Sequence, residues 1–180
     1  MHEFEYLSVF LSLIFGISVT HILAGAIRSI YSREIDATRL VLTGFMFLVL
    51  ILNWWTGFRW KDHEDWSSDI YLIIVFWATI HYVASITLYP PQVSGTRQAL
   101  QYRNTWFFGA FTVLCLGDIL QTAAMGNLFI PKAYLPFVLH FVVLCLAGIY
   151  LNKQKVYLFL AWYFLIIMTL WYLVVRRFLV

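Results

Sequence analysis

The sequence is poor in charge: 12% of its 180 residues are Asp, Glu, Lys or Arg, whereas 62% are hydrophobic. A soluble domain carries about 25% charged residues. A chain with so few ionic groups cannot cover its apolar surface with side chains that water solvates, which excludes a water-soluble fold. The chain is therefore expected to use lipid as its solvent.

Other scarcities exclude further classes. Cys115 and Cys145 lie in apolar sequence, where thiols pack as small side chains, so no disulfide framework is predicted. The 12 Lys and Arg residues form no dense basic stripe, and nucleic acid is not a predicted partner. The first five residues lack the basic leader of a signal peptide, so the first apolar run is expected to stay as a helix. Catalytic motifs such as the P-loop and HExxH are missing, and we favour a non-catalytic protein, although an intramembrane Asp and His can act as acid and base.

Six apolar runs approach the ~20 residues that an α-helix needs to span a bilayer. The loops between them reach about 15 residues at most, so successive helices are expected to be antiparallel neighbours. The predicted fold is an all-α, polytopic bundle in which residues 1–180 form one integral membrane domain. The predicted helices cover residues 6–30, 39–59, 70–89, 105–126, 134–151 and 157–175.

The basic residues of the loops predict an orientation. Seven Lys and Arg residues follow the first, third and fifth predicted helices, and five lie on the other side. By the positive-inside rule, the side with seven is cytoplasmic. Both chain termini are therefore predicted to lie outside.

Asp118 is an acidic residue placed deep in an apolar run. A charged side chain at the centre of a span costs about 3 kcal/mol on insertion scales, so it needs a partner, a proton or a water-filled cavity. Gln121 and Thr122 follow it at three- and four-residue spacing, which puts all three side chains on one helical face. This polar stripe is the strongest candidate site in the sequence.

Other polar residues in the apolar runs sort into two layers by depth. At about 1.5 Å per residue, His21 and His81 lie roughly 13 Å from the cytoplasmic face. Asn53, Asp118 and His140 lie roughly 10 Å from the other face. The sequence thus predicts one layer of two histidines and a second layer of Asn, Asp and His.

Three functions fit these layers. In the first, Asp118 pairs with His140, Asn53 joins them, and the layers pass protons, small ions or a small solute across the membrane. In the second, the buried groups form a hydrogen-bond network that only holds the helices together. In the third, His21 and His81 ligate a b-type haem from two helices. No other metal or cofactor site is predicted.

The first predicted helix carries a ridge of small residues at four-residue spacing. Small side chains let a second helix approach closely, so the ridge favours helix packing over the alternative of a polar pore stripe. A homo-oligomer is among the predicted partners. The ridge consists of Ser8, Ser12, Gly16, Thr20 and Ala24.

Three segments, YLSVFLSLIFGISVTHILAG at 6–25, NWWTGFRW at 53–60 and YRNTWFFG at 102–109, resemble a group of small bacterial six-helix membrane proteins with no assigned activity. The resemblance implies a multi-pass protein of the bacterial inner (plasma) membrane and adds no chemistry. The resemblance and the longest loop also mark residues for testing an alternative function, in which the protein is a non-catalytic membrane subunit or scaffold that docks a partner protein. The resemblance marks Arg59, Arg103, Asn104 and Trp106, and the longest loop adds Arg97.

Overall fold

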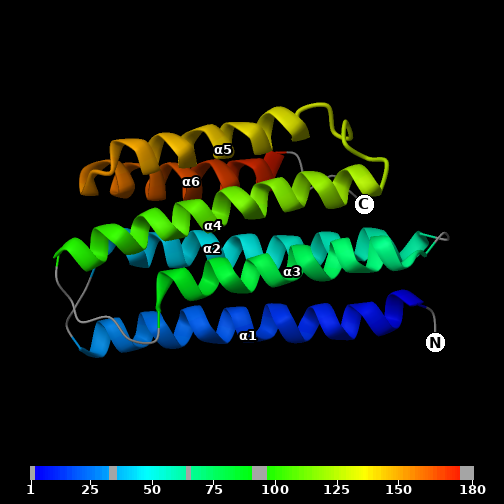
Figure 1. Cartoon of the computed structure of the whole chain (residues 1–180), viewed down its shortest axis with the longest axis horizontal. Coiled ribbons are helices and arrows are strands. Elements are labelled where there is room, and N and C mark those ends of the chain that lie inside the picture. The colour runs from blue at the N-terminus through cyan, green and yellow to red at the C-terminus, as the bar shows by residue number, and fades with distance from the viewer. Residues whose placement is uncertain (1–2, 33–35, 64–65, 91–96, 175–180) are drawn as a thin grey trace.

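The computed structural model describes residues 3–32, 36–63, 66–90 and 97–174, and in these ranges the chain is helical apart from its turns. Six long helices run alternately in opposite directions (Figure 1). Among the described residues, six helices are long and apolar enough to cross a membrane. The elements are α1 (Glu3–Tyr31), α2 (Ala37–Thr56), the 3₁₀ helix η1 (Gly57–Asp62), α3 (Ser68–Leu88), α4 (Arg97–Ala124), α5 (Tyr134–Leu151) and α6 (Gln154–Val174).

The helix boundaries differ from the sequence prediction mainly at α4. Hydropathy places its start at residue 105, whereas the helix begins at Arg97. The added turns, RQALQYRN, are polar, but Arg, Gln, Ala and Leu form helix well, so the helix continues past its apolar part. At the end of α2 the regular helix stops at Thr56 and the chain goes on as η1, whereas the prediction extended one helix to residue 59.

The helices pack in a closed order that differs from their order in the sequence. α3 lies between α1 and α4, α5 packs on α4 and α6, and α2 packs on both α6 and α1. α1 begins and α6 ends at the same end of the bundle (Figure 1), which we call the terminal end. The opposite end, where α1 leads to α2, α3 to α4 and α5 to α6, is called the turn end.

A cluster of buried phenylalanines fills the middle of the bundle. Phe45 of α2 lies 5.0 Å from Phe111 of α4 and 5.5 Å from Phe164 of α6, measured between ring centroids. Phe141 of α5 lies 4.8 Å from Phe164. Edge-to-face and tilted pairs at these distances are favourable, so this aromatic core ties four helices together.

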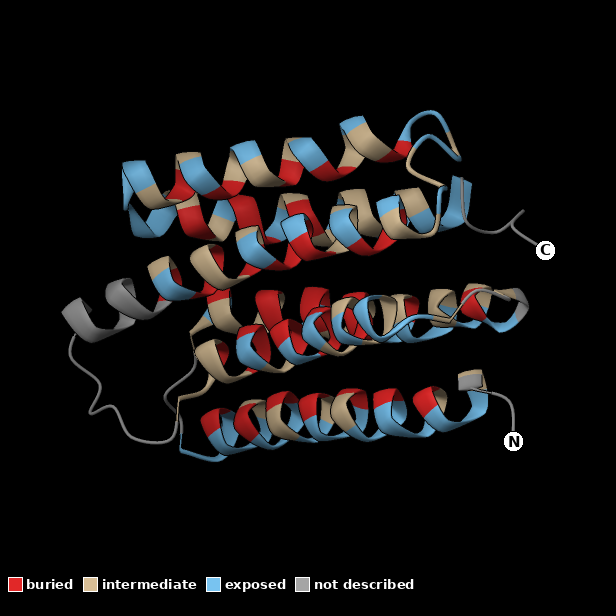
Figure 2. Cartoon of the chain, turned by 45° about the vertical axis from the view of Figure 1, so that its right-hand side comes forward, coloured by how far each residue is buried: buried red, intermediate tan, exposed pale blue. Residues whose placement is uncertain are grey.

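The outward sides of the helices are apolar. Leu13, Val143 and Phe159 each expose 60% or more of their surface, and in Figure 2 exposed residues follow the outer sides of α1, at the bottom, and α5, at the top. In water so large an apolar surface would drive association, whereas lipid solvates it.

In the described part of the chain, the small-residue ridge of α1 is open at its last three positions. Gly16, Thr20 and Ala24 are exposed, and a Cβ added at Gly16 would meet nothing within 4 Å. The face that α1 buries carries larger side chains, such as Leu11 and Phe15, because these bury more apolar area. These three positions thus have no helix packed against them among the described residues, and their role in helix packing stays a prediction.

Candidate ligand pocket around Asp118

Asp118 is half-buried in the last two turns of α4, and three side chains donate hydrogen bonds to its carboxylate. The shortest bond comes from the Tyr134 hydroxyl, 2.7 Å from Oδ2. The Trp77 indole Nε1 and the Gln121 amide Nε2 donate to Oδ1 at 3.2 and 3.4 Å. All three donors are uncharged, so they solvate the carboxylate but leave its charge in place.

Buried side chains extend this network away from the carboxylate. The Tyr134 hydroxyl also lies 2.9 Å from Thr122 Oγ1, and Gln121 Nε2 donates to the same oxygen at 3.0 Å. The Trp60 indole of η1 donates to Gln121 Oε1 at 3.2 Å. Because both ends of the Gln121 amide are engaged, the donors around Asp118 are held in fixed positions.

Local backbone features bring these donors to Asp118. α4 packs closely on α3 at Gly117, where a Cβ would come 3.3 Å from an α3 side chain, and this places Trp77 beside the carboxylate. After α4 the chain turns at Gly126, whose φ of 75° lies in the left-handed region that glycine adopts without strain. The turn leads back to Tyr134, the first residue of α5.

Asn53 and His81 form a second pair next to this network. The Asn53 amide lies 2.8 Å from His81 Nε2, and His81 Nδ1 lies 2.8 Å from the Trp77 carbonyl. Since a carbonyl only accepts, Nδ1 carries the proton and Nε2 accepts from Asn53. Trp77 thus links the two groups, because its carbonyl binds His81 and its indole binds Asp118.

A cavity of about 390 Å³ opens beside Asp118 between α2, α4, α5 and α6. Its volume lies in the range of small-molecule sites. Phe111 and Phe141 of the aromatic core close its inner side, and Trp55 and Trp171 line it nearer the terminal end. The lining residues with amide, hydroxyl or charged groups are Asn53, Thr56, Arg59, Asp118, Tyr134 and Tyr172.

His140 does not pair with Asp118, which corrects the first sequence-based hypothesis. Its Nε2 is buried without a hydrogen-bond partner among the described residues, and its ring lies 4.3 Å from Phe141 and 6.1 Å from Tyr163. Depth alone suggested the pair, but His140 lies about one and two-thirds turns after Tyr134 and therefore points to another side of α5.

His81 belongs with Asn53, not with His21, which corrects the two predicted layers. The two predicted layers lie roughly 13 and 10 Å from opposite faces of a ~30 Å hydrocarbon core. The distance left between the layers is short enough for the side chains of Asn53 and His81 to meet across it. His21 Nε2 bonds to the Tyr89 carbonyl at 3.0 Å instead. Each histidine thus has a partner within the chain, and a haem between them stays an untested prediction.

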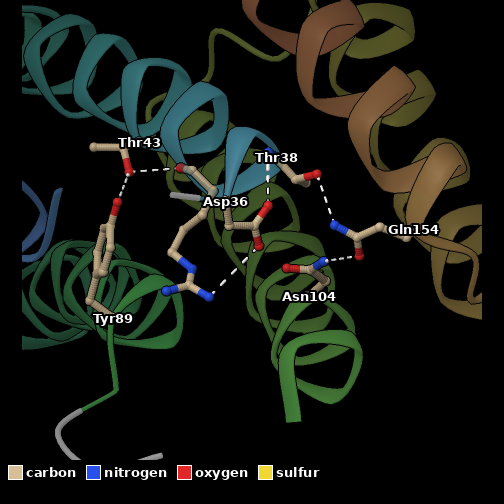
Figure 3. Close-up of polar contacts among 7 residues, drawn as sticks. Asp36, Thr38, Thr43, Tyr89, Asn104 and Gln154 are labelled. Atoms are coloured by element: carbon tan, nitrogen blue, oxygen red, sulfur yellow. Dashed lines mark hydrogen bonds and ion pairs between the residues drawn. The ribbon is translucent and has the colours of Figure 1, made fainter. Parts of the chain in front are cut away.

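A separate polar cluster lies at the turn end of the bundle (Figure 3). Gln154 of α6 donates to Thr38 Oγ1 at 3.1 Å and accepts from Asn104 of α4 at 3.2 Å. Asp36 caps α2 by accepting from the Thr38 backbone at 3.0 Å, and it forms an ion pair of 3.7 Å with Arg39. This cluster joins α2, α4 and α6 and lies on the far side of the aromatic core from the Asp118 cavity.

The residues predicted as a partner surface are scattered. Asn104 is buried in the turn-end cluster, so its predicted role as an exposed contact is wrong. Arg59 is half-buried and lines the Asp118 cavity. Trp106 exposes 57% of its surface, and the side chains of Arg97 and Arg103 lie outside the described residues.

Sequence reasoning missed the aromatic donors of the site. Trp60, Trp77 and Tyr134 are not among the residues that the sequence analysis singles out, although each carries one hydrogen-bond donor. One signal was present: Trp77 lies one helical turn before His81, on the face that carries that histidine. Membrane aromatics near a buried carboxylate are therefore candidate donors.

Comparisons of the chain with protein-family models, with curated proteins and with solved structures found no match. By helix length and hydropathy, the chain is a multi-pass membrane protein. The resemblance to small bacterial six-helix proteins, and with it the inner membrane, stays a prediction.

Proposed function

We propose that this membrane protein binds a small solute with a cationic group at Asp118, as a step in the passage of that solute across the membrane. The observation that carries the proposal is a carboxylate with neutral donors only. Among the described residues, no Lys, Arg or His forms an ion pair with Asp118. A charge in an apolar bundle gains most from a counter-charge, and the cavity beside it has room for one.

A continuous proton or ion channel is a weaker form of the proposal. The aromatic core lies between the Asp118 cavity and the polar cluster of the turn end, so polar groups do not line one path through the described bundle. A site separated from one end of the bundle by packed side chains is instead typical of a carrier, which exposes its site to one face at a time. Passage would then require α2, α4, α5 and α6 to rearrange around the aromatic core.

Docking of a partner protein is the alternative function. It retains Trp106 as an exposed aromatic residue, but Asn104 is buried and Arg59 lines a cavity. The cavity with its unneutralised carboxylate therefore supports binding of a small solute better than it supports a protein interface.

A head-group comparison tests the proposal. The purified protein is titrated in neutral maltoside micelles with hexylamine, hexanol and hexanoate, and tryptophan fluorescence reports binding, since the Trp77 indole contacts Asp118. Hexylammonium is expected to bind at least about tenfold more tightly than hexanol, because hydrogen bonds to charged groups contribute about 1.5–3 kcal/mol. Uptake of labelled hexylamine into proteoliposomes then measures passage.

Asp118→Asn is the decisive variant, since it keeps the shape and the acceptor oxygen but removes the charge. It should lose about tenfold in hexylammonium affinity and should abolish uptake. Asp36→Asn is the matched control, because Asp36 has Arg39 as its own counter-charge and asparagine also caps helices. Equal binding of the three probes, or unchanged binding by Asp118→Asn, would refute the proposal.

A further inference from the structure

Arg59 is a second charged residue in the Asp118 cavity. It lies on η1, immediately after α2, and it lines the cavity together with Thr56 and Phe58. Its Nε donates to the Thr56 carbonyl at 3.4 Å, which holds the base of the guanidinium group against the end of α2. The residue is half-buried, so its charge is only partly hydrated.

No described carboxylate neutralises Arg59. No ion pair joins it to Asp118 or to any other carboxylate whose side chain the structure describes, although the Arg59 and Asp118 side chains line one cavity. Two opposite charges are thus kept apart inside a mainly apolar space. A bound molecule that carries both charges would neutralise each of them at once, and that removes the cost of leaving either unpaired.

The walls between and around these charges are aromatic and apolar. Trp171 of α6 stacks on Phe137 of α5 with ring centroids 3.8 Å apart, and both line the cavity. Trp55, Met168 and Tyr172 line it as well. Such a surface accepts alkyl groups, so the cavity matches a molecule with one apolar part and a head of two opposite charges.

We infer that the cavity binds a zwitterionic amphiphile, with its ammonium group at Asp118, its phosphate or carboxylate at Arg59, and its apolar part on the aromatic wall. A guanidinium group suits this role, since its planar fork binds phosphate or carboxylate through two parallel hydrogen bonds. The inference rests on the proposed function, because it uses the same carboxylate as the cation site. The zwitterion can come from a membrane lipid head group or from a free solute.

The test compares probes that differ in charge and in chains. Dihexanoylphosphatidylethanolamine carries both charges and two chains, phosphoethanolamine carries the head alone, and hexylamine carries the cation alone. Affinities are measured by tryptophan fluorescence in maltoside micelles. The wild-type protein is expected to bind the short-chain lipid about tenfold more tightly than hexylamine, because one more charged group is engaged.

Arg59→Gln is expected to lower this preference about tenfold, while Asp118→Asn weakens the binding of both probes. Lys61→Gln is the matched control, since Lys61 lies two residues later on η1, is exposed and does not line the cavity. It removes the same charge and should leave the preference unchanged. Arg59→Lys should restore part of the preference, which shows that a loss in Arg59→Gln is due to charge and not to misfolding.

The outcomes separate this inference from the proposed function. If hexylamine binds through Asp118 but Arg59→Gln keeps the full preference for the zwitterion, the inference is wrong and the cation site stands. If hexylamine does not bind, both are wrong. If phosphoethanolamine binds as tightly as the short-chain lipid and its binding depends on Arg59, the inference holds and the ligand is a free zwitterion. If phosphoethanolamine binds weakly while the short-chain lipid binds tightly, the inference holds and the ligand is a membrane lipid.

Discussion

Replacing Tyr134 with phenylalanine removes one hydroxyl group from the centre of the network around Asp118. That hydroxyl lies 2.7 Å from Asp118 Oδ2, 3.0 Å from the Asp118 carbonyl oxygen and 2.9 Å from Thr122 Oγ1. The ring is 3% exposed, and phenylalanine keeps its shape. The substitution therefore changes hydrogen bonding and leaves packing nearly as it was.

The expected loss follows from the bond to the carboxylate. A hydrogen bond to a charged group contributes about 1.5–3 kcal/mol, and a neutral one about 0.5–1.5 kcal/mol. Thr122 Oγ1 still accepts a hydrogen bond from the Gln121 amide, so it keeps one of its two side-chain partners. Tyr134→Phe should thus lower the free energy of unfolding by about 1.5–3 kcal/mol, most of it from the bond to Asp118.

The measurement is an equilibrium unfolding titration with SDS in mixed micelles, followed by circular dichroism. Tyr150→Phe is the control, because Tyr150 is 89% exposed and its hydroxyl removal should change stability by less than about 0.5 kcal/mol. Equal stability of Tyr134→Phe and the wild-type protein would refute the reasoning, since it would mean that the carboxylate does not depend on this donor.

Two further variants test how the helices are joined. Gly25→Ala should destabilise the protein by about 1–3 kcal/mol, because the added Cβ would come 2.7 Å from Tyr89 Cβ and overlap its ring. Gly16→Ala is the control, since its Cβ would meet open space, and equal SDS unfolding midpoints of the two variants would contradict this expectation. Asn53→Leu should cost about 1–3 kcal/mol in the same titration, because it leaves the buried Nε2 of His81 without its donor, and wild-type stability would count against that bond.

The six-helix architecture could be predicted from the sequence because the membrane imposes it. A backbone in lipid must satisfy its own hydrogen bonds, so each apolar run of sufficient length becomes a helix. The same reasoning placed Asp118, Gln121 and Thr122 on one face of α4, since helical periodicity within one element depends only on spacing. In the structure, Gln121 donates hydrogen bonds to both Asp118 and Thr122.

The partners of the stripe could not be predicted, because they depend on how each neighbouring helix is rotated about its axis. Both Tyr134 and His140 lie on α5 within reach by depth, and only the rotation of that helix decides which one meets Asp118. Rotation is set by the packing of large side chains, such as Phe141 in the aromatic core. A single sequence carries no record of that packing.

The two half-buried aspartates show why the charge of Asp118 points to a ligand. Asp36 has a counter-charge in its own chain, since Arg39 lies 3.7 Å away, and it also caps α2. Asp118 has three neutral donors, a cavity on its open side and no described cation partner. A purely structural network would be served as well by a neutral acceptor, which avoids the cost of holding a charge in lipid. The negative charge of Asp118 attracts a cation from outside the chain, which a neutral amide at this position would not do.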